Sequence, residues 1–336
     1  MQPVTAVPGN GKHVVVVGAG GNIGSHLAPH LARLTKVARI TLIDRGIYEQ
    51  ANLCSQNITV HDLGRAKAAV QAHRLRRINP MLHVNTIVDA IENVPLGQLR
   101  ADVIVACVDS RGARQYINQV AWRLGTSWID AGVQGDGLLA RVNVYRPGLD
   151  SPCLECAWDQ HDYEVLEQTY PCQEQEREPA PTNAPSSLGA LAAALQAIEC
   201  QKLLAGRWEH VAVSRQVLID ACSHQHYVTT FRRNPRCRFD HQVWPIAPLT
   251  DQPKELTLQQ AFALMREVDG EEPARALRLE GQQFVRQLTC PGCGQLKPVW
   301  RFAGRLRQVC RSVARLWWPT DSACRSGSKH ASFRRR

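Results

Sequence analysis

Short apolar runs alternate with amphipathic segments along the first part of the chain. The runs have the length of strands, and the segments between them repeat apolar residues at helical spacing. We predict strands near 13–17, 39–43, 83–87, 102–106 and 127–130, and helices near 22–34, 65–77 and 111–124. This order predicts an α/β fold with a Rossmann-like, doubly wound and mostly parallel sheet.

The pattern changes in the middle of the chain. Residues 141–145 alternate between apolar and polar, and 211–222 and 226–233 also resemble strands, which predicts an antiparallel extension of the sheet. Residues 188–205 are apolar on most sides and predict a buried helix. The segment 157–187 is rich in Glu, Gln and Pro and shows no period. A long irregular segment of this kind is usually functional, and we interpret it as a crossover loop.

We therefore expect a main domain over residues 1–247, an appendage over 248–303 and a basic tail over 304–336. Cys290-x-x-Cys293, followed by glycine, has the spacing of a zinc knuckle within the appendage. A knuckle needs a second pair, for which only widely separated cysteines remain, so zinc binding there stays open. The tail is expected to be either disordered or an altered terminus.

Positive charge is concentrated in the tail. Ten of the 40 Lys and Arg residues and one of the 30 acidic residues lie in 301–336, so the preceding residues carry a net charge of about +1, against +10 for the chain. This distribution argues against a specific nucleic-acid surface on the main domain. No run reaches the roughly 20 apolar residues that cross a bilayer. The polar N-terminus lacks a signal-peptide pattern, and we expect a cytoplasmic protein without a membrane segment.

A nucleotide site is predicted at the first strand. Residues 14–24 (VVVVGAGGNIG) combine a buried strand, a glycine-rich turn and the start of an apolar helix, so that backbone N–H groups can approach a phosphate. Asp44 ends the next apolar strand, where a carboxylate can accept ribose hydroxyls, and Lys67 follows where an ammonium could reach the phosphates. The glycines of the turn are Gly18, Gly20, Gly21 and Gly24.

An NAD-dependent oxidoreductase is the first alternative. Its G-x-G-x-x-G fingerprint, started at Gly18, requires glycine at position 23, where this chain has Ile23. The sequence also offers no plausible pair of residues for hydride transfer. The glycine spacing therefore argues against a dinucleotide dehydrogenase.

A series of motifs follows the glycine turn in order. The series comprises Asn52-Leu53 with Gln56, LGRAKA (63–68), RINP (77–80), ADVIVACVDSRGAR (101–114), SPCLEC (151–156) and NPRC (234–237). Over roughly residues 12–241, this ordered series resembles the ThiF/MoeB/HesA family, the bacterial relatives of ubiquitin-activating enzymes.

The resemblance implies ATP-dependent adenylation of a carboxylate, usually the C-terminal glycine of a ubiquitin-like or sulfur-carrier-like protein, by a homodimer. It implies that Asp109 holds Mg²⁺, and that Lys67 contacts the phosphates and stabilises charge on the α-phosphoryl oxygens. By the same resemblance, further nucleotide contacts come from Gly20, Gly21, Asp44, Asn52 and Gln56.

Two departures from the family pattern bear on activity. Gly46 stands where the family usually has a second aspartate, and Ser55 replaces an arginine that contacts the triphosphate. Serine cannot supply a bidentate cation, although Arg45, Arg65 or a second subunit are candidates to do so. A catalytically weakened adaptor that binds a ubiquitin-like protein is therefore a second alternative. Adenylation of a tRNA-linked carboxylate is a third, which the near-neutral main domain disfavours.

Twelve cysteines in a chain expected in the cytoplasm are more typical of metal ligands and thiols than of disulfides. Cys153 and Cys156 form a C-x-x-C pair, and Cys237 matches the family's NPxC motif. Family members complete the set with a further cysteine, but here that position is Asp240, with His241 beside it. Imidazole is the commoner partner of three thiolates, so we predict a structural Zn²⁺ site with His241 as the fourth ligand.

Cys172 is the one cysteine in the crossover loop 157–187. A polar loop suits an accessible nucleophile, and family members that form a thioester or acyl-disulfide carry a reactive cysteine in this region. The sequence leaves two interpretations open, a nucleophile that receives the adenylated carboxyl group and a loop cysteine without chemistry. We favour the nucleophile.

Overall fold

The computed structural model describes residues 11–167, 184–245, 259–260, 284–290, 292–302 and 318–322. The chain divides into two compact units, one comprising Met1–Glu92 and Gly97–Trp244, the other Asn93–Leu96 and Pro245–Arg336. The candidate site lies in the first unit, and each unit is described by itself.

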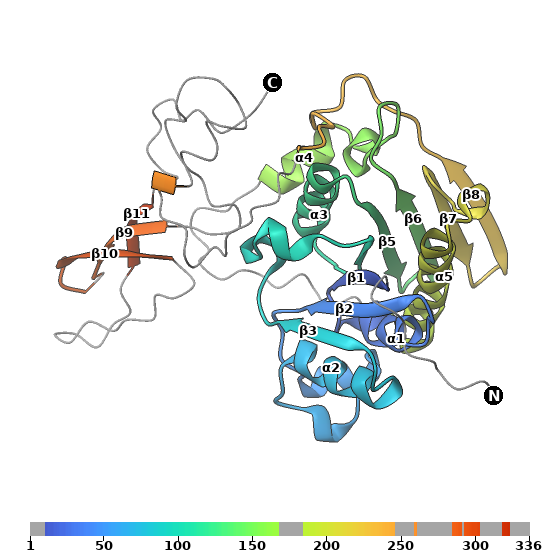
Figure 1. The fold of residues 1–336 in the computed structure, drawn as a ribbon, viewed down its shortest axis with the longest axis horizontal. Coiled ribbons are helices and arrows are strands. Elements are labelled where there is room, and N and C mark those ends of the chain that lie inside the picture. Colours follow the sequence, from blue (N-terminus) through green and yellow to red (C-terminus); the bar gives the residue numbers. More distant parts are fainter. Residues whose placement is uncertain are drawn as a thin grey trace. The chain divides into compact units, whose positions relative to one another are not determined.

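The first unit is built on one eight-stranded sheet in the order β3-β2-β1-β4-β5-β6-β7-β8 (Figure 1). The pairs from β3 to β5 are parallel, and those from β5 to β8 are antiparallel. The strands are β1 (Lys12–Val17), β2 (Val37–Ile43), β3 (His83–Ile87), β4 (Val103–Ala106), β5 (Ser127–Gln134), β6 (Leu139–Tyr145), β7 (Arg215–Asp220) and β8 (Gln225–Thr230). The predicted parallel sheet with an antiparallel extension is confirmed.

Helices cover both faces of this sheet, as a doubly wound fold requires. One face carries α1 (Asn22–Leu31), α2 (Lys67–Ile78) and α5 (Ser186–Ala205), which share a large apolar cluster with alternate residues of β1 and β4. The helix α3 (Arg111–Leu124) packs on β4 and β5 from the other face (Figure 1). All four valines of the Val14–Val17 run in β1 are at most 3% exposed, which shows that both faces of this strand are covered.

The helix α5 is long and apolar enough to span a membrane by length and composition alone. Its apolar surface is accounted for by burial, because it packs along α1 and against β5 and β6. Leu188, Ala192 and Cys200 are among its buried residues. The sequence-based prediction of a buried helix here is confirmed.

The crossover segment begins with a short helix, α4 (Gln160–Glu167), which the sequence analysis did not predict. Only two turns long, it shows too few repeats for a helical period to stand out. Residues 168–183, with Cys172, lie outside the described residues.

The second unit contains a three-stranded antiparallel sheet in the order β10-β9-β11. Its strands are β9 (Phe284–Thr289), β10 (Leu296–Phe302) and β11 (Trp318–Ser322), the last within the segment expected as a tail. Cys290 and Cys293 lie between β9 and β10, where the Gly294 amide donates to the Cys290 carbonyl (2.9 Å) and Gly294 has φ +69°. The widely separated cysteines that remain for a second zinc-binding pair, Cys310 and Cys324, lie outside the described residues.

Candidate functional site

The glycine turn follows β1 at the carboxyl edge of the sheet, where neighbouring atoms leave no room for a side chain at Gly18 or Gly20. Gly18 has φ +75°, and a Cβ there would lie 2.5 Å from the carbonyl oxygen of Cys107, just after β4. A Cβ at Gly20 would lie 2.4 Å from Lys67 Cβ. The turn therefore lies directly against the end of β4 and the start of α2.

Asp44, immediately after β2, ties this turn to the next loop. Its carboxylate accepts hydrogen bonds from the backbone amides of Gly20 (2.8 Å) and Gly46 (2.9 Å). The sequence indicated that Asp44 binds the ribose, but it did not indicate that Asp44 also binds these two loop amides. A carboxylate has further lone pairs for hydroxyl donors, so the two roles are compatible.

Lys67 begins α2 beside the glycine turn. Its backbone amide donates to the Gly46 carbonyl (2.9 Å), and its Nζ lies 5.5 Å from the centroid of the Tyr48 ring. The structure pairs it with no carboxylate among the described residues. The half-buried ammonium is thus available to an incoming anion.

Asp109 follows β4 at the same edge of the sheet and is exposed. Its backbone carbonyl accepts a hydrogen bond from Arg114 Nη1 (3.3 Å), and its carboxylate has no partner within the described part of the chain. The loop after β4 runs beside the glycine turn, as the Gly18–Cys107 approach shows. Loops after parallel strands converge in this way where α/β folds bind ligands.

The segment with Asn52, Ser55 and Gln56 lies in and after a 3₁₀ helix, Gln50–Cys54. Asn52 Oδ1 accepts the backbone amide of Glu49 (2.9 Å), so this side chain caps its own helix. Gln56 Oε1 is buried and has no partner, which leaves an acceptor available. Arg65 is one of the candidates to replace the missing arginine. Its Nη1 lies 3.8 Å from Asp62 Oδ1, so the two side chains form an ion pair.

A buried ion cluster beside this edge was missed by the sequence analysis. Asp130 on β5 is fully buried, and its oxygens accept from Arg114 Nε (2.9 Å) and Arg141 Nη1 (2.7 Å). The negative charge of Asp130 raises the pKa of Arg141. The cluster joins α3, β5 and β6 and fixes the loop that carries Asp109.

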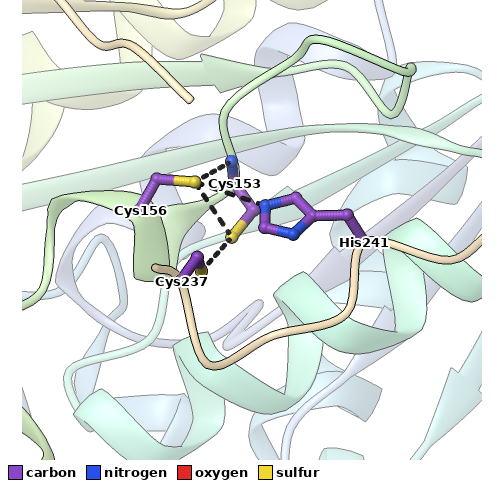
Figure 2. A group of neighbouring side chains, drawn as sticks. All are labelled: Cys153, Cys156, Cys237 and His241. Atoms are coloured by element: carbon purple, nitrogen blue, oxygen red, sulfur yellow. Dashed lines mark hydrogen bonds between the residues drawn. The ribbon is translucent and has the colours of Figure 1, made fainter. Parts of the chain in front are cut away.

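A second candidate site is a metal centre formed by Cys153, Cys156, Cys237 and His241, whose ligand atoms all lie within 4.8 Å of one another (Figure 2). Cys153 Sγ lies 3.8 Å from Cys156 Sγ and 3.7 Å from Cys237 Sγ. His241 Nε2 lies 3.2 Å from Cys156 Sγ. Cys153 is the N-cap of the 3₁₀ helix Leu154–Ala157, and Cys156 lies within that helix. The other two residues follow β8, so segments distant in the sequence meet here.

The donor set fits Zn²⁺. His241 Nδ1 donates to the Phe239 carbonyl (2.7 Å), which leaves the Nε2 lone pair directed at the sulfurs, the arrangement of a metal-bound imidazole. The hydrogen bond between Cys153 and Cys156 lowers the pKa of Cys156 and raises that of Cys153, so it favours a thiolate at Cys156. Three thiolates and one imidazole are a common zinc set.

Asp240 was the alternative fourth ligand, and the structure places it elsewhere. Its carboxylate forms a bidentate pair with Arg123 (2.6 and 3.0 Å). The ring of His241 meets Trp122 edge to face, with centroids 4.8 Å apart. Of the two candidates for the fourth ligand, Asp240 and His241, it is His241 that lies in the cluster.

Comparisons with known proteins give a consistent result. A family model described as the ThiF family matches residues 10–239. The chain is 29% identical over 198 residues to the sulfur carrier protein ThiS adenylyltransferase of Escherichia coli K12, covering 58% of this chain and 73% of that protein. It is 30% identical over 158 residues to ubiquitin-like modifier-activating enzyme 5 of Xenopus laevis, covering 43% of this chain and 39% of that protein.

Solved structures agree on the fold. Escherichia coli MccB, solved with ATP, matches with a TM-score of 0.55 at 24% identity, over 68% of this chain and 66% of that one. At this identity the match establishes a shared fold.

Proposed function

Because the chain belongs to the ThiF family, we propose that it uses ATP and Mg²⁺ to adenylate the C-terminal carboxylate of a ubiquitin-like or sulfur-carrier-like protein. The names of its relatives, a ThiS adenylyltransferase and a ubiquitin-like modifier-activating enzyme, support this substrate class. The observation that carries the proposal is the meeting of the glycine turn, Asp44, Lys67 and Asp109 at one edge of the sheet.

The chemistry requires two anions to meet. An oxygen of the substrate carboxylate attacks the α-phosphorus of ATP, the bond to the bridging oxygen breaks, and pyrophosphate leaves. Lys67, which no carboxylate neutralises among the described residues, would stabilise the negative charge that grows on the α-phosphoryl oxygens. Asp109 would hold Mg²⁺, which supplies further neutralisation of the triphosphate when bound. Asp44 would orient the nucleoside through its ribose.

The four-residue cluster would hold a structural Zn²⁺ through Cys153, Cys156, Cys237 and His241. Bound metal would join the segment after β6 to the segment after β8. Four protein donors would fill a tetrahedral coordination sphere and leave no position for water or substrate. The site therefore fits a structural rather than a catalytic zinc ion.

An adaptor function is the second candidate, and Ser55 is the observation that favours it. Without the family arginine, the chain could bind the nucleotide and the partner protein. The negative charge of the triphosphate would then be neutralised too little for adenylation to occur. This candidate predicts ATP binding without turnover.

The first prediction concerns nucleotide identity. Calorimetry on the purified chain should show binding of ATP with Mg²⁺ and much weaker binding of NAD, because the glycine spacing and Lys67 suit a triphosphate. Tight NAD binding with no response to ATP would contradict the proposed function.

The second prediction concerns Cys172, to which we propose that the adenylated carboxyl group is passed as a thioester with release of AMP. It is the one cysteine in the crossover segment, so no neighbour there can replace it. Cys172→Ala should retain pyrophosphate exchange but lose a thiol-sensitive adduct with the partner protein. Persistence of the adduct in this variant would place the nucleophile elsewhere, and Cys222→Ala, an exposed cysteine on another loop, is the matched control.

A further inference from the structure

Tyr48 lies beside the glycine turn, and the reaction described above assigns it no role. Its side chain is 1% exposed, and its hydroxyl oxygen lies 2.8 Å from the position of a Cβ at Gly20. Its ring faces the ammonium of Lys67, 5.5 Å from the centroid. We propose that Tyr48 is a positioning residue that holds the Lys67 ammonium at the glycine turn and thereby sets the affinity of the site for ATP. This inference rests on the proposed function.

The stem of Lys67 is confined between two glycines. A Cβ at Gly20 would lie 2.4 Å from Lys67 Cβ, and a Cβ at Gly46 would lie 3.1 Å from both Cδ and Cε. These approaches leave the side chain a narrow path along the loop backbone. The direction of the stem is therefore fixed by packing, and the position of the ammonium depends on the group it meets at the end.

That group is an aromatic face rather than a carboxylate. The nearby carboxylate of Asp44 accepts the amides of Gly20 and Gly46 and forms no ion pair with Lys67 in the described part of the chain. A carboxylate partner would neutralise Lys67 and compete with a phosphate. A π face attracts the cation without cancelling its charge, so the ammonium is held in place yet still available to the nucleotide.

Tyr48 is itself rigidly held. Its backbone amide donates to the Arg65 carbonyl (3.0 Å), and its carbonyl accepts from the Gly64 amide (2.9 Å). Gln71 Nε2, from the next turn of α2, donates to its hydroxyl (2.8 Å). Burial raises the pKa of Tyr48, so the phenol stays neutral and adds no charge of its own. The ring is thus fixed relative to the helix that begins with Lys67.

The test is a double-mutant cycle on ATP affinity, measured by calorimetry with Mg²⁺ on the full chain. Tyr48→Met keeps an apolar side chain of similar length and removes the ring, and it should weaken ATP binding roughly threefold to thirtyfold, the range of a cation–π contact. Tyr48→Phe keeps the ring and should retain most of the affinity. In a Lys67→Ala background, Tyr48→Met should change the affinity by less than about twofold, because Tyr48 acts through Lys67.

Equal weakening by Tyr48→Met in the two backgrounds would overturn the inference, as would no weakening in either. A chain that binds no ATP before any substitution overturns the proposed function and this inference together. ATP binding with additive effects overturns this inference alone.

A measurement on the unaltered sequence covers the case in which Tyr48→Met does not fold. After reductive ¹³C-methylation of lysines, the Lys67 methyl resonance, identified by its absence in Lys67→Arg, should be displaced upfield by the ring of Tyr48. A Lys67 resonance at the position of exposed lysines would overturn the inference.

Discussion

Asp109→Ala should reduce ATP–pyrophosphate exchange by a hundredfold or more, which is the order of loss when a charge-stabilising group is removed from a reacting centre. The carboxylate follows β4 beside the glycine turn, where it can hold Mg²⁺ against the triphosphate. Without it, the triphosphate keeps its full charge and repels the incoming carboxylate. The loss should appear in the exchange that the chain catalyses at a saturating concentration of the partner protein.

The fold should survive this change. Asp109 is exposed and its carboxylate has no partner in the described part of the chain, so the unfolding temperature should stay close to that of the parent. Glu209→Ala, which removes a carboxylate 67% exposed on a different loop, is the matched control and should leave exchange intact. Parental exchange rates in Asp109→Ala would remove Asp109 from the metal role.

Cys153→Ser should destabilise the whole first unit. Binding of a structural Zn²⁺ contributes about 10–16 kcal/mol in small zinc domains, while a typical domain is stable by only about 5–15 kcal/mol. The four ligands come from the segments after β6 and after β8, so losing the metal releases both. We expect low soluble yield and a much lower unfolding temperature.

Metal analysis completes this prediction. Relative to Cys222→Ser, which changes an exposed cysteine outside the cluster, Cys153→Ser should contain one equivalent less zinc. The difference is taken between variants because the Cys290-x-x-Cys293 motif is a separate candidate site. Absence of zinc from protein purified without chelators would overturn the zinc assignment.

The sequence predicted the parallel part of the fold well because its signals are local. A run of four valines, a glycine turn and an amphipathic helix each depend on residues next to one another in the chain. The metal cluster was also predictable, since a C-x-x-C pair and a distant cysteine followed by histidine have few other uses. The sequence alone did not decide whether Asp240 or His241 is the fourth metal ligand. Asp240 pairs with Arg123, which is far away in the sequence, so only the structure shows this contact.

The interactions that hold the nucleotide residues in place were not predictable. Asp44 binds two loop amides, and Asp130 is buried between two arginines from α3 and β6. Tyr48 approaches Lys67 because residues 47 and 66 form a bridge between two loops. Each of these contacts depends on which loops lie side by side in the folded chain. The spacing of residues along the sequence does not indicate such contacts.

The most direct test of the account is ATP–pyrophosphate exchange by the unaltered chain with a panel of ubiquitin-like and sulfur-carrier proteins that end in Gly-Gly. The account predicts exchange that depends on one such partner and disappears when the C-terminal carboxylate of that partner is amidated, because that carboxylate is the nucleophile. A partner that binds the chain in the presence of ATP and Mg²⁺ without promoting exchange would contradict it and favour the adaptor function.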